Sequence, residues 1–122
     1  MNWLAVALGG ACGACMRFGL MRLIPPAGGY PWAVQLANVL GSFLIGLLFV
    51  QIALRWGNQH AAWQLLGVGL LGGFTTYSTF SLDTVRLIEQ GRMTTALVYV
   101  LTTLVLCIGM AAVGVLLGRR LM

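Results

Sequence analysis

Four long runs of apolar residues divide this 122-residue chain, and they limit what it can fold into more than any other feature. The runs cover residues 2–23, 32–54, 61–90 and 93–118. A helix of about 20 residues crosses the hydrocarbon core of a bilayer, and only helices let so short a chain satisfy its backbone in lipid. Only 7% of the residues are charged, against roughly a quarter in soluble domains. We therefore expect an all-α integral membrane protein, with residues 1–122 forming a single transmembrane domain of four helices.

Short polar or proline-containing segments separate the runs. "PPAGGYP" follows the first run and "RWGNQ" ends the second, and the two adjacent prolines rule out continuation of the helix. The first charged residue is Arg17, so the start of the chain lacks the basic segment of a cleaved signal peptide. We expect the first run to be a retained helix of a multi-pass protein of the cell (inner) membrane.

The seven arginines are scattered singly or in one pair at the ends of the apolar runs. Because they form no basic patch that could neutralise phosphates, nucleic-acid binding is not expected. With the N-terminus inside, the cytoplasmic side would carry Arg55, Arg119 and Arg120. The other side would carry Arg22, Arg92 and, depending on its depth, Arg86. The positive-inside rule gives almost no preference for such a tie, which leads to the hypothesis of dual topology and antiparallel dimers.

The third run is interrupted at its middle by the segment 70–83, "LLGGFTTYSTFSLD". Gly72 and Gly73 weaken helix propagation, and the threonine hydroxyls that follow compete with the backbone ladder. We expect a broken helix whose first half ends near Gly73 and whose second half starts near Ser78, with Ser78 or Thr79 as N-cap. The alternative is a continuous, kinked helix whose hydroxyls bond back to their own turn.

A break at mid-membrane depth frees backbone groups, which is tolerable only where they are buried in protein or line a polar cavity. The carbonyls that end the first half can coordinate a cation, and the N–H groups that open the second half favour an anion. Tyr77 and Phe80 are three residues apart and would share a face of the second half. Their positively polarised ring edges could contact a small anion, although the spacing by itself favours core packing.

Other polar residues stand alone within the apolar runs. Asn38 in the second run needs a partner in lipid, either another helix or a passing ion. Thr102 and Thr103 place hydroxyls in the fourth run, where they can bond their own helix or line a pathway. Arg17, late in the first run, can snorkel to the interface or attract anions at an aqueous vestibule.

Small residues recur at the spacing that lets helices approach closely. The GxxxG pairs are Gly9 with Gly13, Gly69 with Gly73, and Gly114 with Gly118. We expect packing contacts within one chain, between chains, or both. Cys12 and Cys15 form a CxxC without the βαβ pattern of a redox motif, so these cysteines are interpreted as packing residues.

Three segments together resemble the Fluc (CrcB) fluoride channel family: "GGACGACMRFGL" at 9–20, "ANVLGSFLIG" at 37–46 and "GGFTTYSTFSLD" at 72–83. The resemblance covers essentially the whole chain, and the third string is highly specific. It implies an antiparallel, dual-topology homodimer with two narrow pores. Through them, fluoride would leave the cytoplasm passively, down its electrochemical gradient.

The resemblance also implies roles for individual residues. A structural sodium ion at the dimer interface would be held by the backbone carbonyls of Gly72 and Thr75. Fluoride would pass the residues that match the family's pore: Asn38, Tyr77, Ser78, Thr79, Phe80 and, less closely, Thr103. Tyr77 departs from the family's phenylalanine, which makes Phe80 the better candidate for an anion contact.

The main alternative is a small, dual-topology, proton-coupled multidrug exporter. Such a protein needs a membrane-embedded carboxylate, typically in the first helix, whereas the only acids here are Asp83 and Glu89, both in the third run. A purely structural assembly protein would leave the polar break without a reason. No combination of nucleophile, base and orienting group indicates an enzyme.

Overall fold

The computed structural model describes residues 2–122 and contains four helical spans in the order predicted. The first is α1 (Trp3–Leu23). The second joins α2 (Trp32–Leu48), the π-helical turn η1 (Phe49–Ala53) and α3 (Leu54–Trp56). The third joins η2 (Trp63–Leu71) and α4 (Gly72–Phe74), and resumes as α5 (Tyr77–Glu89). The fourth is α6 (Met93–Arg120). The prediction of an all-α membrane protein with a broken third helix is confirmed.

The turns between spans are built on glycines with positive φ. Gly57, at φ +90°, ends α3, and Gly91, at φ +74°, follows α5. At the second turn the Gly91 amide donates to the Ile88 carbonyl, and the Arg92 amide donates to the Leu87 carbonyl. This pair of bonds is the Schellman motif, which satisfies the last carbonyls of a helix. At the first turn the Gly57 amide donates to the Ala53 carbonyl.

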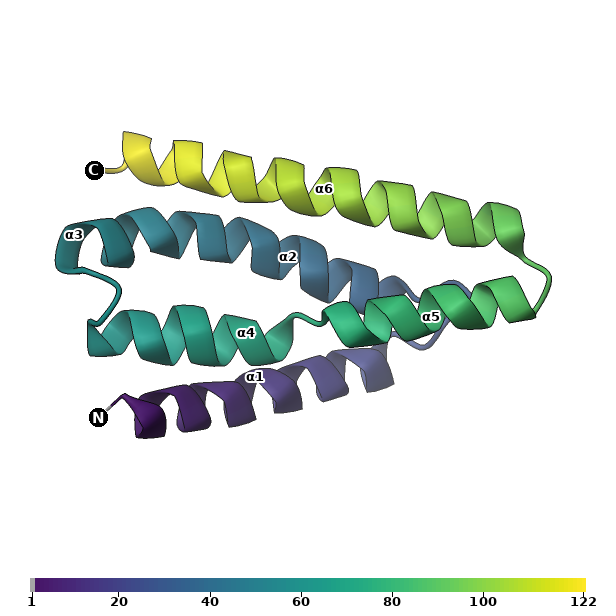
Figure 1. Ribbon diagram of the computed structural model, residues 1–122, viewed down its shortest axis with the longest axis horizontal. Coiled ribbons are helices and arrows are strands. Elements are labelled where there is room, and N and C mark those ends of the chain that lie inside the picture. The colour runs from purple at the N-terminus through teal and green to yellow at the C-terminus, as the bar shows by residue number, and fades with distance from the viewer. Residues whose placement is uncertain (1) are drawn as a thin grey trace.

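Two parallel helix pairs make up the bundle (Figure 1). In one pair α1 packs along η2 and α4, and in the other α2 packs along α6. The glycines of the GxxxG pairs form the contacts. A Cβ on Gly9 or Gly13 would strike the carbonyls of Leu65 or Leu70, and one on Gly114 would strike that of Phe43. The expectation that these motifs pack within the chain is confirmed.

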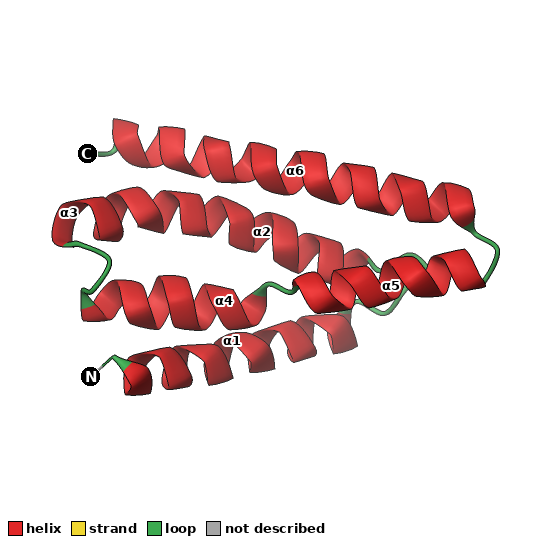
Figure 2. Cartoon of the chain, viewed as in Figure 1, coloured by secondary structure: helices red, strands yellow, loops and turns green. Residues whose placement is uncertain are grey.

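The third span is interrupted at Thr75 and Thr76, seen as the loop between α4 and α5 (Figure 2). Both residues are extended, with φ, ψ of −84°, 156° and −151°, 120°. The second half starts at Tyr77 with Thr76 as its N-cap, because the Thr76 hydroxyl accepts the Thr79 amide at 3.1 Å. The prediction of Ser78 or Thr79 as N-cap is wrong by two or three residues.

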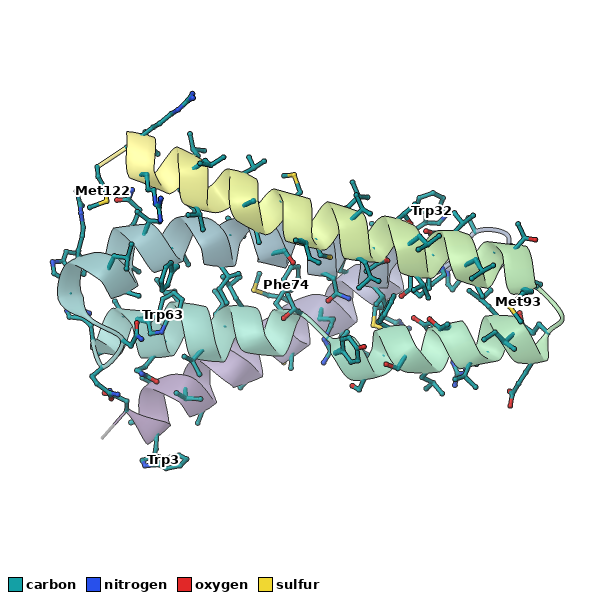
Figure 3. The ribbon with its side chains drawn as sticks, turned by 45° about the horizontal axis from the view of Figure 1, so that its top comes forward. Trp3, Trp32, Trp63, Phe74, Met93 and Met122 are labelled. Carbon is teal, nitrogen blue, oxygen red and sulfur yellow. The ribbon has the colours of Figure 1, made fainter. Side chains whose placement is uncertain are left out.

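Much of the outer surface is apolar, as lipid or a second protein requires. Trp3 is 87% exposed and points away from the bundle, whereas Phe74 lies near its middle (Figure 3). Cys12 and Cys15 are exposed on α1 and are free thiols. Their expected packing role is therefore not fulfilled by contacts within the chain.

Candidate ion-binding site at the helix break

The Asn38 side chain on α2 hydrogen-bonds the backbone of Thr76, the extended residue at the break. Its Oδ1 accepts the Thr76 backbone amide at 2.7 Å, and its Nδ2 donates to the Thr76 carbonyl at 3.0 Å. Both residues are buried. A side-chain amide thus replaces the helical partners of one extended residue, which is what unpaired backbone groups in an apolar interior require. Of the two alternatives for Asn38, bonding to another helix is the one the structure contains.

The end of the first half is fixed by two further side chains. The Thr75 hydroxyl donates to the Leu71 carbonyl at 2.8 Å, and the Thr75 amide donates to the same carbonyl at 2.9 Å. From α1, Arg17 donates through Nε to the Gly73 carbonyl at 3.2 Å. A cation at the C-terminal end of a helix is favoured by the helix dipole. Arg17 therefore lies against the break, and its predicted role in a vestibule stays a prediction.

Several backbone groups at the break have no hydrogen-bond partner among residues 2–122. These are the carbonyls of Gly72, Phe74 and Thr75, and the amides of Tyr77 and Ser78. The free carbonyls and the free amides lie at the facing ends of two helix halves. The break thus offers acceptors for a cation and donors for an anion within a few residues.

A groove of about 270 Å³ lies beside the break, between α2, the break itself, α5 and α6. Its lining residues are Asn38, Gly41, Ser42, Ile45, Leu71, Thr75, Thr76, Tyr77, Phe80, Thr103, Leu104 and Cys107. Five predicted site residues thus come together here: Asn38, Thr75, Tyr77, Phe80 and Thr103. The groove combines an amide, hydroxyls and aromatic rings, with no acidic side chain to repel an anion.

The two aromatic residues of the groove are in contact but differ in exposure. Their ring centroids lie 5.7 Å apart, so they share a face of α5 as predicted. Phe80 is 6% exposed and also packs on Tyr99, at 5.1 Å between centroids. Tyr77 is 77% exposed. Phe80 is therefore held in place by the chain itself, whereas Tyr77 projects from its surface.

Four predicted site residues do not line this groove. Arg17 is bonded to Gly73 on the α1 side of the break. Gly72 and Ser78 are exposed on the surface of the chain, and Thr79 is half-buried near the start of α5. The Ser78 hydroxyl lies 3.3 Å from that of Thr76. These residues lie around the break, but in a single chain they do not line the groove.

Sequence reasoning missed several polar residues at the site. Tyr99 and Cys107 flank Thr103 at intervals of four residues, so the three lie on one face of α6, and that spacing could have revealed them. Tyr99 is fully buried and donates to Asp83 Oδ2 at 3.4 Å. Gln35 lies three residues before Asn38, on the same side of α2. Its partners are 67 and 68 residues away, which no local pattern indicates.

A second hollow of about 250 Å³ lies toward the α1–α2 loop end of the bundle. Its lining includes Asp83, Arg86 and Gln90 of α5 together with Pro26 and Pro31. Asp83 thus lines this outer hollow and also accepts the hydrogen bond from Tyr99. Arg86 lines this hollow and Arg17 does not.

Comparison with known proteins places the chain in a family. The sequence profile described as "CrcB-like protein, Camphor Resistance (CrcB)" matches residues 4–115. The chain belongs to the CrcB family. The match spans all four helices and includes the break. A resemblance to this family was predicted from three segments, and it is confirmed.

Curated relatives in the CrcB family are similar over almost their whole length. Proteins named fluoride-specific ion channel FluC from Nitrobacter winogradskyi and Thermus thermophilus are 42% and 41% identical, and each alignment covers 98% of this chain. The protein of that name from Paracoccus denitrificans is 45% identical over 98% of this chain and 96% of its own length. The CrcB chain described here thus has no large insertion or deletion relative to them.

Proposed function

We propose that this protein is a fluoride-selective ion channel that lets fluoride leave the cytoplasm passively. The observation that carries the proposal is the groove at the helix break, where an anion meets hydrogen-bond donors and ring edges but no acidic side chain. Near-full-length relatives that carry the name fluoride-specific ion channel support it. The protein is accordingly a multi-pass membrane channel and not an enzyme, and the inner membrane is its expected location.

The pathway must replace the water that fluoride loses on entering a narrow pore. Candidate donors in and beside the groove are the Thr103 hydroxyl, the second Nδ2 hydrogen of Asn38 and the free amides at the start of α5. Phe80 supplies a positively polarised ring edge, which attracts an anion without holding it tightly. Several weak donors in series suit conduction, because an ion must leave each site as readily as it enters.

A structural sodium ion fits the free carbonyls at the break. Sodium is a hard cation that takes oxygen ligands, and Gly72 and Thr75 each carry a carbonyl without a partner in the described chain. Two carbonyls are too few for a coordination shell, so a second copy of the chain would have to supply the others. When bound, the ion would neutralise carbonyl dipoles that are otherwise costly at this depth. Replacing sodium by N-methylglucamine should then lower the melting temperature of the purified protein, and an unchanged value would count against the site.

The exposed face of the break supports an antiparallel homodimer. Gly72, Tyr77 and Ser78 are exposed in a single chain, although polar groups at mid-membrane depth need protein around them. A second copy related by a two-fold axis would cover this face and bring both sets of carbonyls together. Each groove would then be closed by the partner into one of two pores.

Liposomes loaded with fluoride or with chloride test the function. The purified protein should release fluoride once a potassium ionophore clamps the potential, and chloride efflux should stay at the level of protein-free liposomes. Equal rates for both anions would overturn the proposed selectivity, and no fluoride efflux would overturn the function. The multidrug exporter is not favoured, because the first span has no carboxylate. Its signature would be uptake of an organic cation driven by a pH gradient.

A further inference from the structure

Gln35 is a buried amide that does not itself line the groove. It lies on α2 and is 7% exposed. Its Nε2 lies 2.8 Å from Thr102 Oγ1 and 3.1 Å from Thr103 Oγ1 on α6. One amide group thus contacts two adjacent hydroxyls, of which only the Thr103 hydroxyl belongs to a groove-lining residue.

The hydrogen bonds of Thr102 determine which end of the Gln35 amide, the NH₂ or the oxygen, faces the two threonines. The Thr102 hydroxyl lies within hydrogen-bond distance of the Val98 carbonyl, at 2.5 Å. A carbonyl can only accept, so the single hydroxyl proton of Thr102 is directed there. The group of Gln35 beside Thr102 must therefore donate, which requires the NH₂ and excludes the amide oxygen. The Tyr30 hydroxyl, 3.3 Å from Thr102 Oγ1, then donates to the same oxygen.

With one N–H directed to Thr102, the Gln35 amide directs its second N–H to Thr103. The Thr103 oxygen is thereby an acceptor, and its own proton has no partner among residues 2–122. Thr102 bonds back to its own helix, whereas Thr103 does not. Since the Thr103 side chain is 5% exposed and lines the groove, its free O–H is available as a donor to whatever occupies the groove.

We propose that Gln35 is a positioning residue for anion permeation: it fixes the Thr103 hydroxyl as a hydrogen-bond donor to fluoride in the groove. A hydroxyl that accepts a hydrogen bond also becomes a stronger donor, because the two bonds polarise one another. Without the amide, Thr103 would be free to turn its proton to its own helix, as Thr102 does, and present lone pairs to the anion. The inference rests on the proposed function and adds to it a residue outside the pore.

The test is a double-mutant comparison of fluoride efflux from liposomes. Gln35→Leu removes the amide at similar volume, and Thr103→Val removes the hydroxyl at similar shape. Each should slow efflux by about tenfold, the effect of losing one hydrogen bond to a charged group. The double variant should be no slower than Thr103→Val alone, within about twofold, because Gln35 acts only through that hydroxyl. Thr103→Ser, which keeps the hydroxyl, should retain efflux and keep its dependence on Gln35.

Gln51→Leu is the matched control. Gln51 also joins the second span to α6, through an Nε2 that donates to the Gly118 carbonyl at 2.8 Å, but it does not line the groove. Its loss should change stability without changing efflux per folded protein. Should Gln35→Leu fold poorly, Gln35→Met provides the same comparison.

Unchanged efflux in the Gln35 variants would overturn the inference. An equal further loss from Gln35→Leu in the Thr103→Val background would also overturn it, because Gln35 would then act independently of that hydroxyl. If the unsubstituted protein conducts no fluoride, the proposed function itself fails, a result distinct from either of these.

Discussion

At the scale of single residues, the site is built from side chains whose hydrogen-bonding capacity is used by the backbone. Asn38 accepts the Thr76 amide with its oxygen and donates one N–H to the Thr76 carbonyl. Arg17 donates through Nε to the Gly73 carbonyl. Their types and depth could be predicted from the sequence, because polar residues in apolar runs are conspicuous. Their partners could not, since each bond joins residues at least 38 positions apart.

Phe80→Ile should abolish fluoride efflux from liposomes while the protein still assembles. The substitution keeps an apolar side chain against Tyr99 but removes an aromatic ring that lines the groove, and with it the positively polarised ring edge. Efflux per folded protein should fall at least about a hundredfold, which is the effect expected from losing about two hydrogen bonds to the ion. Phe18→Ile, at a position 64% exposed on α1, is the control and should conduct normally. Near-native flux in Phe80→Ile would remove Phe80 from the pathway.

Asn38→Leu should destabilise the fold by about 2–5 kcal/mol, because it leaves a buried amide and a buried carbonyl of Thr76 unpaired. Thermal unfolding in detergent, followed by tryptophan fluorescence, measures the change. Ser42→Ala is a fair comparison, since Ser42 lies one turn further along α2 and makes no hydrogen bond to another residue of the described chain. Similar melting temperatures for the two variants would show that the two hydrogen bonds between Asn38 and Thr76 are not needed to keep the helix broken.

At the scale of helices, the number of spans and the existence of the break follow from local sequence, whereas their pairing does not. The apolar runs predict four helices, and Gly72 and Gly73 with two threonines predict an interruption. The second half starts next to the predicted Ser78, but its N-cap is Thr76, because Asn38 from another helix fixes Thr76 in an extended conformation. The helices α1, η2 and α6 are apolar on all sides, so no periodicity in them indicates that α1 pairs with η2 and α2 with α6.

Two glycines of α6 test the packing. A Cβ on Gly114 would strike the Phe43 carbonyl, whereas one on Gly109 meets nothing within 4 Å. Gly114→Ala should therefore force α2 and α6 apart and cost about 1–3 kcal/mol. Gly109→Ala should be neutral or stabilising by up to about 1 kcal/mol, because alanine favours the helix. Melting temperatures in one detergent decide between them, and equal values would contradict the close contact.

At the scale of the whole molecule, the arginines are divided evenly between the two ends of the bundle. Both termini and the α3–η2 turn lie at one end, and the other two turns lie at the opposite end (Figure 1). The first end carries Arg55, Arg119 and Arg120, and the second carries Arg22, Arg86 and Arg92. With three arginines at each end, the positive-inside rule predicts no preferred orientation of the chain in the membrane. Reporter fusions at the C-terminus should therefore give signal on both sides of the membrane.

Adding positive charges at one end of the bundle should fix the orientation in which the chain inserts and so test whether function needs both orientations. Asn58→Lys with Gln59→Lys adds two positive charges at the end that holds the termini, and Ala27→Lys with Gln90→Lys adds two at the other end. Each double variant should insert in one orientation only, and the two orientations should be opposite. Because an antiparallel dimer needs one chain of each orientation, neither variant alone should support fluoride efflux from cells. Their co-expression should restore it. Full activity from a variant whose reporter signal lies on one side would show instead that the working assembly is parallel or monomeric.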